Sequence, residues 1–310
     1  MNLIIGALTI GLILALLGLG VFVSYRIYHT LDLTADGAYA IGAAVAAALL
    51  VHGWNPYLAT GAAVLAGAAA GGLTGLLRTR LLVNALLAGV LTSTALYSVC
   101  LFVMGSGNLS LAATDHLGKV GERLAPTLGL PETLTLAGDA VSGASLATLL
   151  LVTVLVGGLA VALALFLGTE VGSAMRAAGN NPQMARAVAL DVNGMVVLGL
   201  CLSNGLVALS GALFAQYAGF ANIQMIIGAV VTGLANLMLG EALLGRRPLW
   251  RWIAGAVAGA VLFRLLVAAA VRAGLDSNAL KLVTAALVLA VLVPPRLTRR
   301  SRRAAEAHRV

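Results

Sequence analysis

Charged side chains are scarce in this sequence. Asp, Glu, Lys and Arg make up only 10% of its 310 residues, whereas 61% of the residues are hydrophobic. A soluble domain carries roughly a quarter charged residues, so this composition excludes an ordinary soluble domain. It predicts an all-α, polytopic membrane protein, and the 37 glycines suit helices that pack closely in lipid.

Residue sets for catalysis or metal binding are also missing. Cys100 and Cys201 form no CxxC motif, and the four histidines lie far apart along the chain. No nucleophile and base stand at a familiar spacing, which disfavours an intramembrane enzyme. The sequence contains no Gly-x-x-x-x-Gly-Lys-Ser/Thr motif. We therefore expect this chain to bind no cofactor and not to hydrolyse ATP by itself.

Long apolar segments are abundant. About 20 apolar residues cross a bilayer as a helix, and about nine segments (8 to 10) approach that length. They lie at residues 2–23, 36–53, 57–77, 82–104, 144–167, 194–217, 222–244, 250–271 and 279–293. We expect one transmembrane domain over 1–295 and a basic tail at 296–310, with the second and seventh segments as candidate broken helices.

Positive charges alternate along the chain. Of the 19 Lys and Arg residues, 14 follow odd-numbered segments. The positive-inside rule then places the N-terminus and the loop 105–143 outside, and the segment 168–193 and the tail in the cytoplasm. The net charge of +8 is thus attributed to topology and not to nucleic-acid binding. The tail either contacts anionic headgroups of the lipid bilayer or serves only as a topology anchor.

The segment 168–193 is a polar interval between two apolar segments. Its centre combines residues that end and start helices: Gly179, Asn180, Asn181 and Pro182. Asn181 can cap a new helix, and Pro182 suits its first position. The expected helix over 182–190 carries Met184, Ala185 and Val188 on one face. Residue spacing leaves two readings open, an ordinary loop or a surface on which a second protein acts.

Two charged residues fall within apolar segments. Arg264 lies near the middle of the eighth segment, and a charge in hydrocarbon costs roughly 3 kcal/mol or more. Glu241, in the seventh segment, is its nearest candidate counter-ion by sequence. Such a pair would either lock two helices together or take part in transport.

Further polar residues mark a candidate translocation path. Asp32 and Asp36 would share a helix face unless the chain breaks at Gly37, and either carboxylate could instead cap a helix N-terminus. Amides in the sixth and seventh segments could line a polar route or bond between helices. They are Asn204, Gln216, Asn222, Gln224 and Asn236.

A weak internal repeat is also visible. Ile41, Gly42 and Ala43 align with the Ile-Gly-Ala sequence at 227–229, in segments expected to run in opposite directions. This is the relation that an inverted repeat requires, although a composition rich in small residues also produces such matches by chance.

Several stretches resemble the permease subunits of ABC importers related to the branched-chain amino-acid and ribose permeases. The similarity is closest to the tryptophan/tyrosine-type uptake permeases. The matching stretches, which extend over nearly the whole chain, are 31–43, 86–90, 95–98, 175–186, 202–217 and 281–285.

The resemblance implies a permease homodimer in the bacterial inner membrane, with two cytoplasmic ABC ATPase subunits that would bind the ATP and Mg²⁺ used in transport. An extracytoplasmic binding protein or lipoprotein would deliver a small solute, such as an amino acid. The segment 168–193 would be the coupling helix that contacts the ATPase. Its contact residues would be Arg176, Gly179, Asn180, Asn181, Pro182, Met184 and Arg186. The alternatives are a secondary transporter or channel that works without ATPases, with Arg264 and Glu241 as gating charges, and a scaffold.

Overall fold

The computed structural model describes residues 2–274, apart from 113, 115, 130, 132, 137, 138, 246 and 247, together with residue 286. The long helices are α1 (Asn2–Phe22), continued by a π-helix (Val23–Ile27), α2 (Thr34–Val51), α3 (Pro56–Thr79), α4 (Ala85–Met104), α6 (Gly143–Gly168), α9 (Val192–Ala218) and α11 (Leu249–Arg272). The expected ninth segment, 279–293, and the tail, 296–310, lie outside the described residues.

Seven of the described helices are long and apolar enough to cross a membrane. They correspond to the expected segments one to six and eight, with ends that differ by a few residues. The all-α polytopic fold expected from the composition is therefore confirmed.

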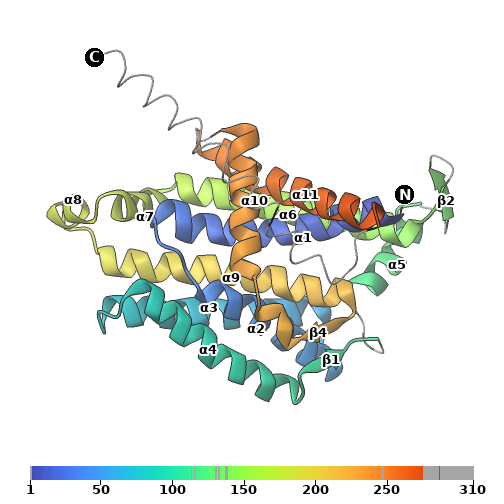
Figure 1. The fold of residues 1–310 in the computed structure, drawn as a ribbon, viewed down its shortest axis with the longest axis horizontal. Helices are drawn as coiled ribbons and strands as arrows, with labels where there is room; N and C mark the ends of the chain where they lie inside the picture. Colours follow the sequence, from blue (N-terminus) through green and yellow to red (C-terminus); the bar gives the residue numbers. More distant parts are fainter. Residues whose placement is uncertain are drawn as a thin grey trace, which may run out of the picture.

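Helix α9 forms the centre of the bundle. In Figure 1 it lies between α1, α6 and α11 on one side and α2, α3 and α4 on the other. Small residues allow this packing, because a Cβ added at Gly42 would lie 2.1 Å from the Ala208 carbonyl oxygen. One added at Gly71 would lie 2.1 Å from the Leu200 oxygen. Glycine thus brings the backbones of α2 and α3 against α9, as the glycine content predicts.

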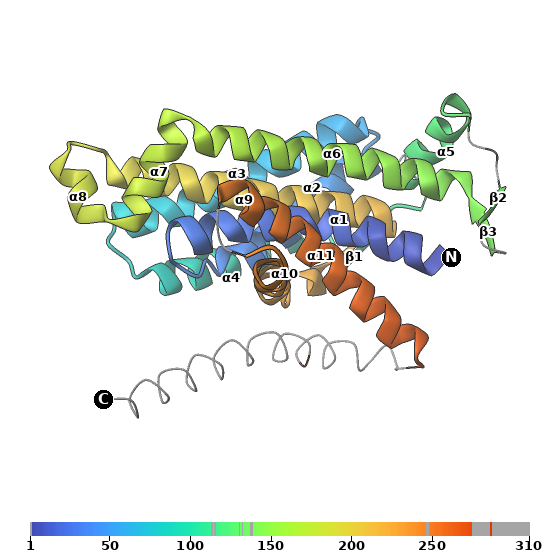
Figure 2. The same ribbon diagram turned by 90° about the horizontal axis from the view of Figure 1, so that it is seen from above.

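The seventh expected segment does not form one long helix. After strand β4 (Phe220–Asn222) and a 3₁₀ turn (Ile223–Ile226), α10 covers only Ala229–Leu244. It runs across the other helices in Figure 1 and is seen end-on in Figure 2. Gly228, with φ 92°, precedes it, and Gly245, with φ 78°, follows it. The expectation of a broken seventh segment is correct, but that of a span over 222–244 is wrong.

The second segment differs from expectation in the opposite way. Helix α2 continues through Gly37 without a break. A Cβ at Gly37 would lie 3.0 Å from the Ser93 Cα, so this glycine serves close packing against α4. The suggested repeat is also not matched in structure, because Gly42 lies inside α2 whereas Gly228 precedes α10.

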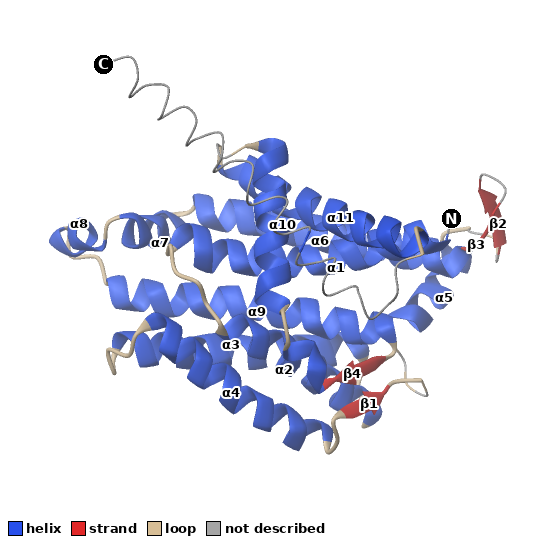
Figure 3. Cartoon of the chain, viewed as in Figure 1, coloured by secondary structure: helices blue, strands red, loops and turns tan. Residues whose placement is uncertain are grey.

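The short elements form two groups at opposite ends of the molecule. One end carries α5 (Leu117–Thr127) and the strand pairs β1 (Asn108–Ser110) with β4, and β2 (Thr133–Leu136) with β3 (Asp139–Ser142). Figure 3 shows this group opposite α7 (Glu170–Asn180) and α8 (Pro182–Ala187). Most of the loop 105–143 therefore lies at the end away from the segment 168–193, as the alternating charge pattern requires.

Candidate functional site

The α7–α8 segment is built by local capping. The Asn181 side chain accepts a hydrogen bond from the Met184 N–H at 3.1 Å, and Pro182 occupies the first turn of α8. Thr169 caps α7 in the same way, accepting from the Gly172 N–H at 3.3 Å. The predicted helix start at Asn181 and Pro182 is therefore confirmed, although α8 ends at Ala187 and not at 190.

Gly179 and Asn180 do not break the chain, contrary to expectation. Both belong to α7, and the break is confined to Asn181, with φ −146° and ψ 88°. A Cβ added at Gly179 would lie 1.9 Å from the Ile27 carbonyl oxygen. Gly179 is thus the point where α7 contacts the π-helix at the end of α1.

The surface of α8 is apolar on its outer side. Met184 is 57% exposed and Val188 is 68% exposed, whereas Ala185 is only 1% exposed and packs with Val192. The expected single face of Met184, Ala185 and Val188 is therefore wrong: Ala185 anchors the segment to the bundle, and the other two side chains point outward. Arg176 and Arg186 are also exposed. Exposed apolar residues beside arginines on a fixed helix suit contact with another protein.

A small cavity lies behind this segment. It has a volume of about 250 Å³ and is lined by Tyr28, Arg78, Gly179, Pro182 and Arg186, among others. Burial raises the pKa of the Tyr28 phenol, which therefore stays protonated and donates to the Met195 carbonyl oxygen. Tyr28 thereby joins the end of the π-helix to the first turns of α9.

Asp32 lies in the middle of the bundle. Its carboxylate accepts from the Asn204 Nδ2 at 2.7 Å and from the Thr34 N–H at 2.9 Å, and all three residues are buried. Asn204 is near the centre of α9, so α2 begins deep inside the protein and not at its surface. The Arg78 guanidinium attracts the same carboxylate. Asp32 and Asn204 thus tie α2 to α9.

A chain of hydroxyl groups continues this network. The Thr34 and Thr74 hydroxyl oxygens are 2.8 Å apart, and Thr74 donates to Thr92 at 2.9 Å. This chain joins α2, α3 and α4. A further bond of 2.7 Å runs from the Gln216 amide to the Thr60 hydroxyl oxygen and joins α9 to α3.

Asp36 caps a helix that is distant in sequence. Although it lies in the first turn of α2, its Oδ1 accepts from the Val230 N–H of α10 at 2.8 Å. Two helix N-termini therefore share one carboxylate, which their dipoles favour. The capping alternative is correct for both carboxylates: Asp32 bonds to the start of its own helix, and Asp36 to the start of α10.

Glu241 is not the counter-ion of Arg264. It forms an ion pair with Arg26 of the π-helix, and both side chains are largely buried. Among the described residues, the hydroxyl groups of Tyr39 and Tyr217 interact electrostatically with the Arg264 guanidinium. Proximity in sequence is misleading here, because α10 crosses the other helices (Figure 1) and its last turn pairs with the π-helix that continues α1.

The remaining amides fall into two classes. Asn236, on α10, is buried and donates to the Leu14 carbonyl oxygen at 3.2 Å. Asn222 instead accepts from the Gln224 N–H in a local turn, so these two residues do not bond between helices.

Sequence reasoning missed several of these partners. In the sequence, Arg26 indicates only topology. Thr34, Thr74 and Thr92 lie in or beside apolar segments, where single threonines do not reveal their hydrogen-bond partners. Ser203 and Ser210, which donate to the Gly20 and Ile13 carbonyl oxygens at 2.7 Å, also escaped notice. Their spacing of seven residues is two helical turns and could have indicated one polar stripe on α9.

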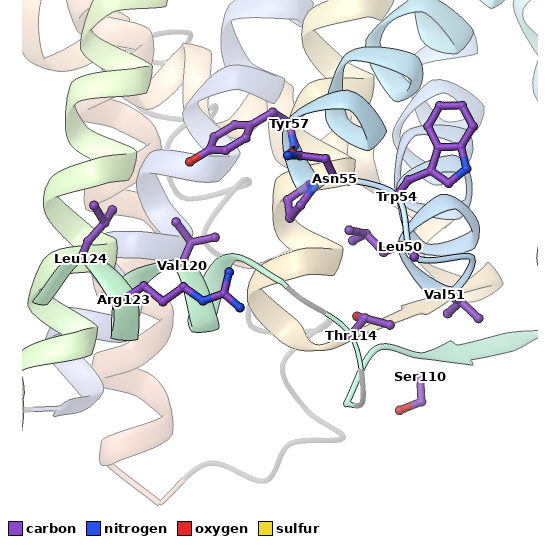
Figure 4. Close-up of a pocket in the computed structure, with 12 residues that line it drawn as sticks. Leu50, Val51, Trp54, Asn55, Tyr57, Ser110, Thr114, Val120, Arg123 and Leu124 are labelled. Carbon is purple, nitrogen blue, oxygen red and sulfur yellow. Dashed lines mark hydrogen bonds between the residues drawn. The ribbon is translucent and has the colours of Figure 1, made fainter.

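The opposite end of the protein contains a larger hollow. A cavity of about 850 Å³ lies between α5 and the turn at 50–57. In Figure 4 the Arg123 side chain extends from α5 into this space. Trp54 and Tyr57, from the facing turn, are exposed beside it. No group of three or more metal-binding side chains occurs among the described residues.

The sequence matches the family described as branched-chain amino acid transport system, permease component, over residues 3–293. A tyrosine transport system permease protein from Clostridioides difficile (strain R20291) is 34% identical over 289 residues, 93% of this chain and 90% of the relative. An uncharacterized protein from Rickettsia prowazekii (strain Madrid E) is 33% identical over 242 residues, 78% of each chain.

A solved structure has the same fold. It is an ABC transporter assigned to the metal-chelate type, in an inward-facing conformation. The TM-score is 0.52 at 20% identity, and the match covers 94% of this chain and 84% of that one. The transmembrane bundle, the match over residues 3–293 and the similarity to a tyrosine permease lead to one assignment. The chain belongs to the family of permease components of branched-chain amino acid transport systems and is a membrane-spanning permease.

Proposed function

We propose that this permease imports an amino acid across the bacterial cytoplasmic membrane, and that α7–α8 is the coupling segment on which the ATPase acts. The single observation that supports the coupling role is the outer surface of α8. Met184 and Val188 point outward, while the buried Ala185 and the Asn181 cap fix the helix to the bundle. A partner that moves α8 would therefore also displace the helices beneath it.

An aromatic amino acid is the first candidate for the solute. This choice is supported by the 34% identity with a permease named for tyrosine transport. Uptake of labelled L-tyrosine by proteoliposomes containing the whole transporter, with leucine and ribose as competitors, tests it. The choice is supported if excess unlabelled tyrosine competes and leucine and ribose do not. Stronger competition by leucine or ribose would overturn it.

An extracytoplasmic binding protein would deliver the solute at the end that carries α5. The cavity between α5 and the turn at 50–57 supports this role, because it combines the Arg123 guanidinium with the exposed aromatic rings of Trp54 and Tyr57. Aromatic residues and arginine are enriched in protein interfaces. Substitution of Tyr57 by Ala should weaken binding-protein docking without changing ATPase binding.

Two copies of the permease would form the transporter. The side that carries α10 and α11 exposes apolar residues, including Val231, Leu243 and Trp250. Asp36, Asn236, Glu241 and Arg264 lie on or beside these helices, so the translocation path is proposed to run along this side. Cross-linking between copies through Leu243→Cys would support this arrangement. Efficient cross-linking through Leu65→Cys on α3 instead would contradict it.

Alanine substitution tests the coupling role. In Met184→Ala and Arg186→Ala variants, the affinity for the ATPase should fall about tenfold if each side chain contributes on the order of 1.4 kcal/mol to the contact, and solute uptake per ATP hydrolysed should fall with it. Leu65→Ala is the matched control, because Leu65 is 71% exposed on α3, away from α8. Unchanged coupling and ATPase binding in both α8 variants would refute the proposal.

A further inference from the structure

We propose that Arg26 is a positioning residue for coupling. Through its ion pair with Glu241, it fixes the last turn of α10 to the π-helix against which α7 packs. Displacement of α7–α8 by an ATPase is then carried to α10. This inference rests on the coupling role proposed above for α7–α8, and it adds a route by which the movement reaches the middle of the bundle.

The first link joins α7 to the π-helix. Met175 is fully buried in the cluster that includes Ile27 and Tyr28. Gly179, one turn later on the same side of α7, has no room for a Cβ, which would lie 1.9 Å from the Ile27 carbonyl oxygen. Two contacts one turn apart fix the direction of α7 as well as its distance, so α7 and the π-helix move together.

The second link joins the π-helix to α10. Arg26 belongs to the π-helix, and its guanidinium pairs with Glu241 in the last helical turns of α10. Only 19% and 7% of the two side chains are exposed. Separating a buried ion pair leaves uncompensated charges in a low-dielectric interior, which is strongly unfavourable. The ion pair therefore stays formed when the helices move, and it keeps the π-helix and α10 together.

The opposite end of α10 is held less tightly. There the Asp36 carboxylate accepts from the Val230 N–H at 2.8 Å. Breaking one hydrogen bond to a carboxylate costs less than separating a buried ion pair. Gly228, in a left-handed conformation with φ 92°, lies immediately before the helix and offers a pivot. We therefore expect α10 to follow the π-helix at Glu241 and to turn about its start at Gly228.

Helix α11 moves with α10. A Cβ added at Gly240 would lie 1.9 Å from the Gly255 carbonyl oxygen, and one at Gly259 would lie 2.1 Å from the Asn236 oxygen. Backbones this close form one unit. The ion pair of Arg26 thus positions both α10 and α11, beside which the translocation path is proposed to run.

Hydrogen–deuterium exchange of the whole transporter in lipid nanodiscs tests this route. Amide exchange is compared between the nucleotide-free state and the state trapped with ATP and vanadate. Two regions are measured, α7–α8 and α10. In the wild type, exchange should change in both regions by at least about threefold between the states. In Arg26→Gln, the change in α7–α8 should persist, while the change in α10 should fall at least about threefold.

Two further variants separate positioning from a purely structural role. The double variant Arg26→Glu with Glu241→Arg restores opposite charges at the same two places, and the response of α10 should return. Arg251→Gln is the matched control, because Arg251 is an exposed arginine on α11 that stacks on Trp250. In this variant, the exchange of α7–α8 and of α10 should respond to nucleotide as in the wild type.

The possible failures are distinguishable. If α7–α8 shows no nucleotide response in the wild type, the coupling role itself is wrong, and this inference falls with it. If α7–α8 responds to nucleotide, and α10 responds equally in wild type and Arg26→Gln, the coupling role stands and the positioning role of Arg26 is wrong. Should Arg26→Gln fail to fold, Glu241→Gln provides the same test from the other side of the ion pair, with the same two outcomes.

Discussion

The helices around α9 and the helix α10 are held in different ways. Around α9, glycines bring backbones into contact, and polar side chains bond across its interfaces with α1, α2 and α3, as Asp32 does with Asn204. Helix α10 is only 16 residues long, lies between two glycines with positive φ, and packs its backbone closely on α11. Polar contacts at Asp36, Asn236 and Glu241 attach it to the rest of the bundle. The first arrangement suits a fixed scaffold, and the second suits an element that changes position as a unit.

Glycine-to-alanine substitutions should separate the two regions most strongly. At Gly42 the new Cβ would lie 2.1 Å from a backbone oxygen of α9, which cannot move aside alone, and we expect a loss of about 3 kcal/mol. At Gly233 of α10 the nearest atom is a side-chain methyl of Val21 at 2.6 Å, so the loss should stay below about 1 kcal/mol.

Equilibrium unfolding in detergent measures both losses of stability. Gly61→Ala, with open space around the new Cβ, is the control. Equal losses at Gly42 and Gly233 would remove the distinction.

Loss of the central carboxylate should have the next largest effect. In Asp32→Ala, the buried Asn204 amide and the Thr34 N–H lose their acceptor, and the expected loss is about 2 kcal/mol. The same unfolding titration measures it. Serine in place of Asp32 should recover part of the loss, because a hydroxyl can still accept one of the two bonds. A loss below that of Asp36→Ala would contradict the scaffold role.

A smaller effect than at Asp32 is expected at Asp36. Asp36→Ala removes a cap from the start of α10, which costs about 1 kcal/mol of stability. Amide exchange should nevertheless rise at Val230 and the neighbouring first turn of α10, while α2 stays protected. Faster exchange spread evenly over α2 and α9 would show that α10 is part of the scaffold after all.

The sequence alone predicts most of the scaffold. Segment length and composition identify the seven long helices, and the Asn181–Pro182 pair identifies the start of α8. These features depend on local chemistry, namely apolar length, capping and the missing N–H of proline.

The parts that the sequence does not predict depend on contacts between distant residues. Arg26 and Glu241 are 215 positions apart, and Asp36 and Val230 are 194 apart. No spacing rule links such residues, so the sequence pairs Arg264 with Glu241, the nearest acidic residue within an apolar segment. Gly37 and Gly179 are likewise typical of chain breaks when only the local sequence is considered. Glycine in a helix signals either a break or a close approach, and only the neighbouring backbone decides which of the two applies.

Cross-linking at Met184 tests the coupling role most directly. In a background with Cys100→Ala and Cys201→Ala, Met184→Cys should cross-link to the ATPase in the assembled transporter, with a yield that changes when ATP and vanadate are added. Tyr57→Cys, at a more exposed position near the opposite end, should not cross-link to the ATPase. Equal yields from the two positions, or none from Met184 in an intact complex, would contradict the account.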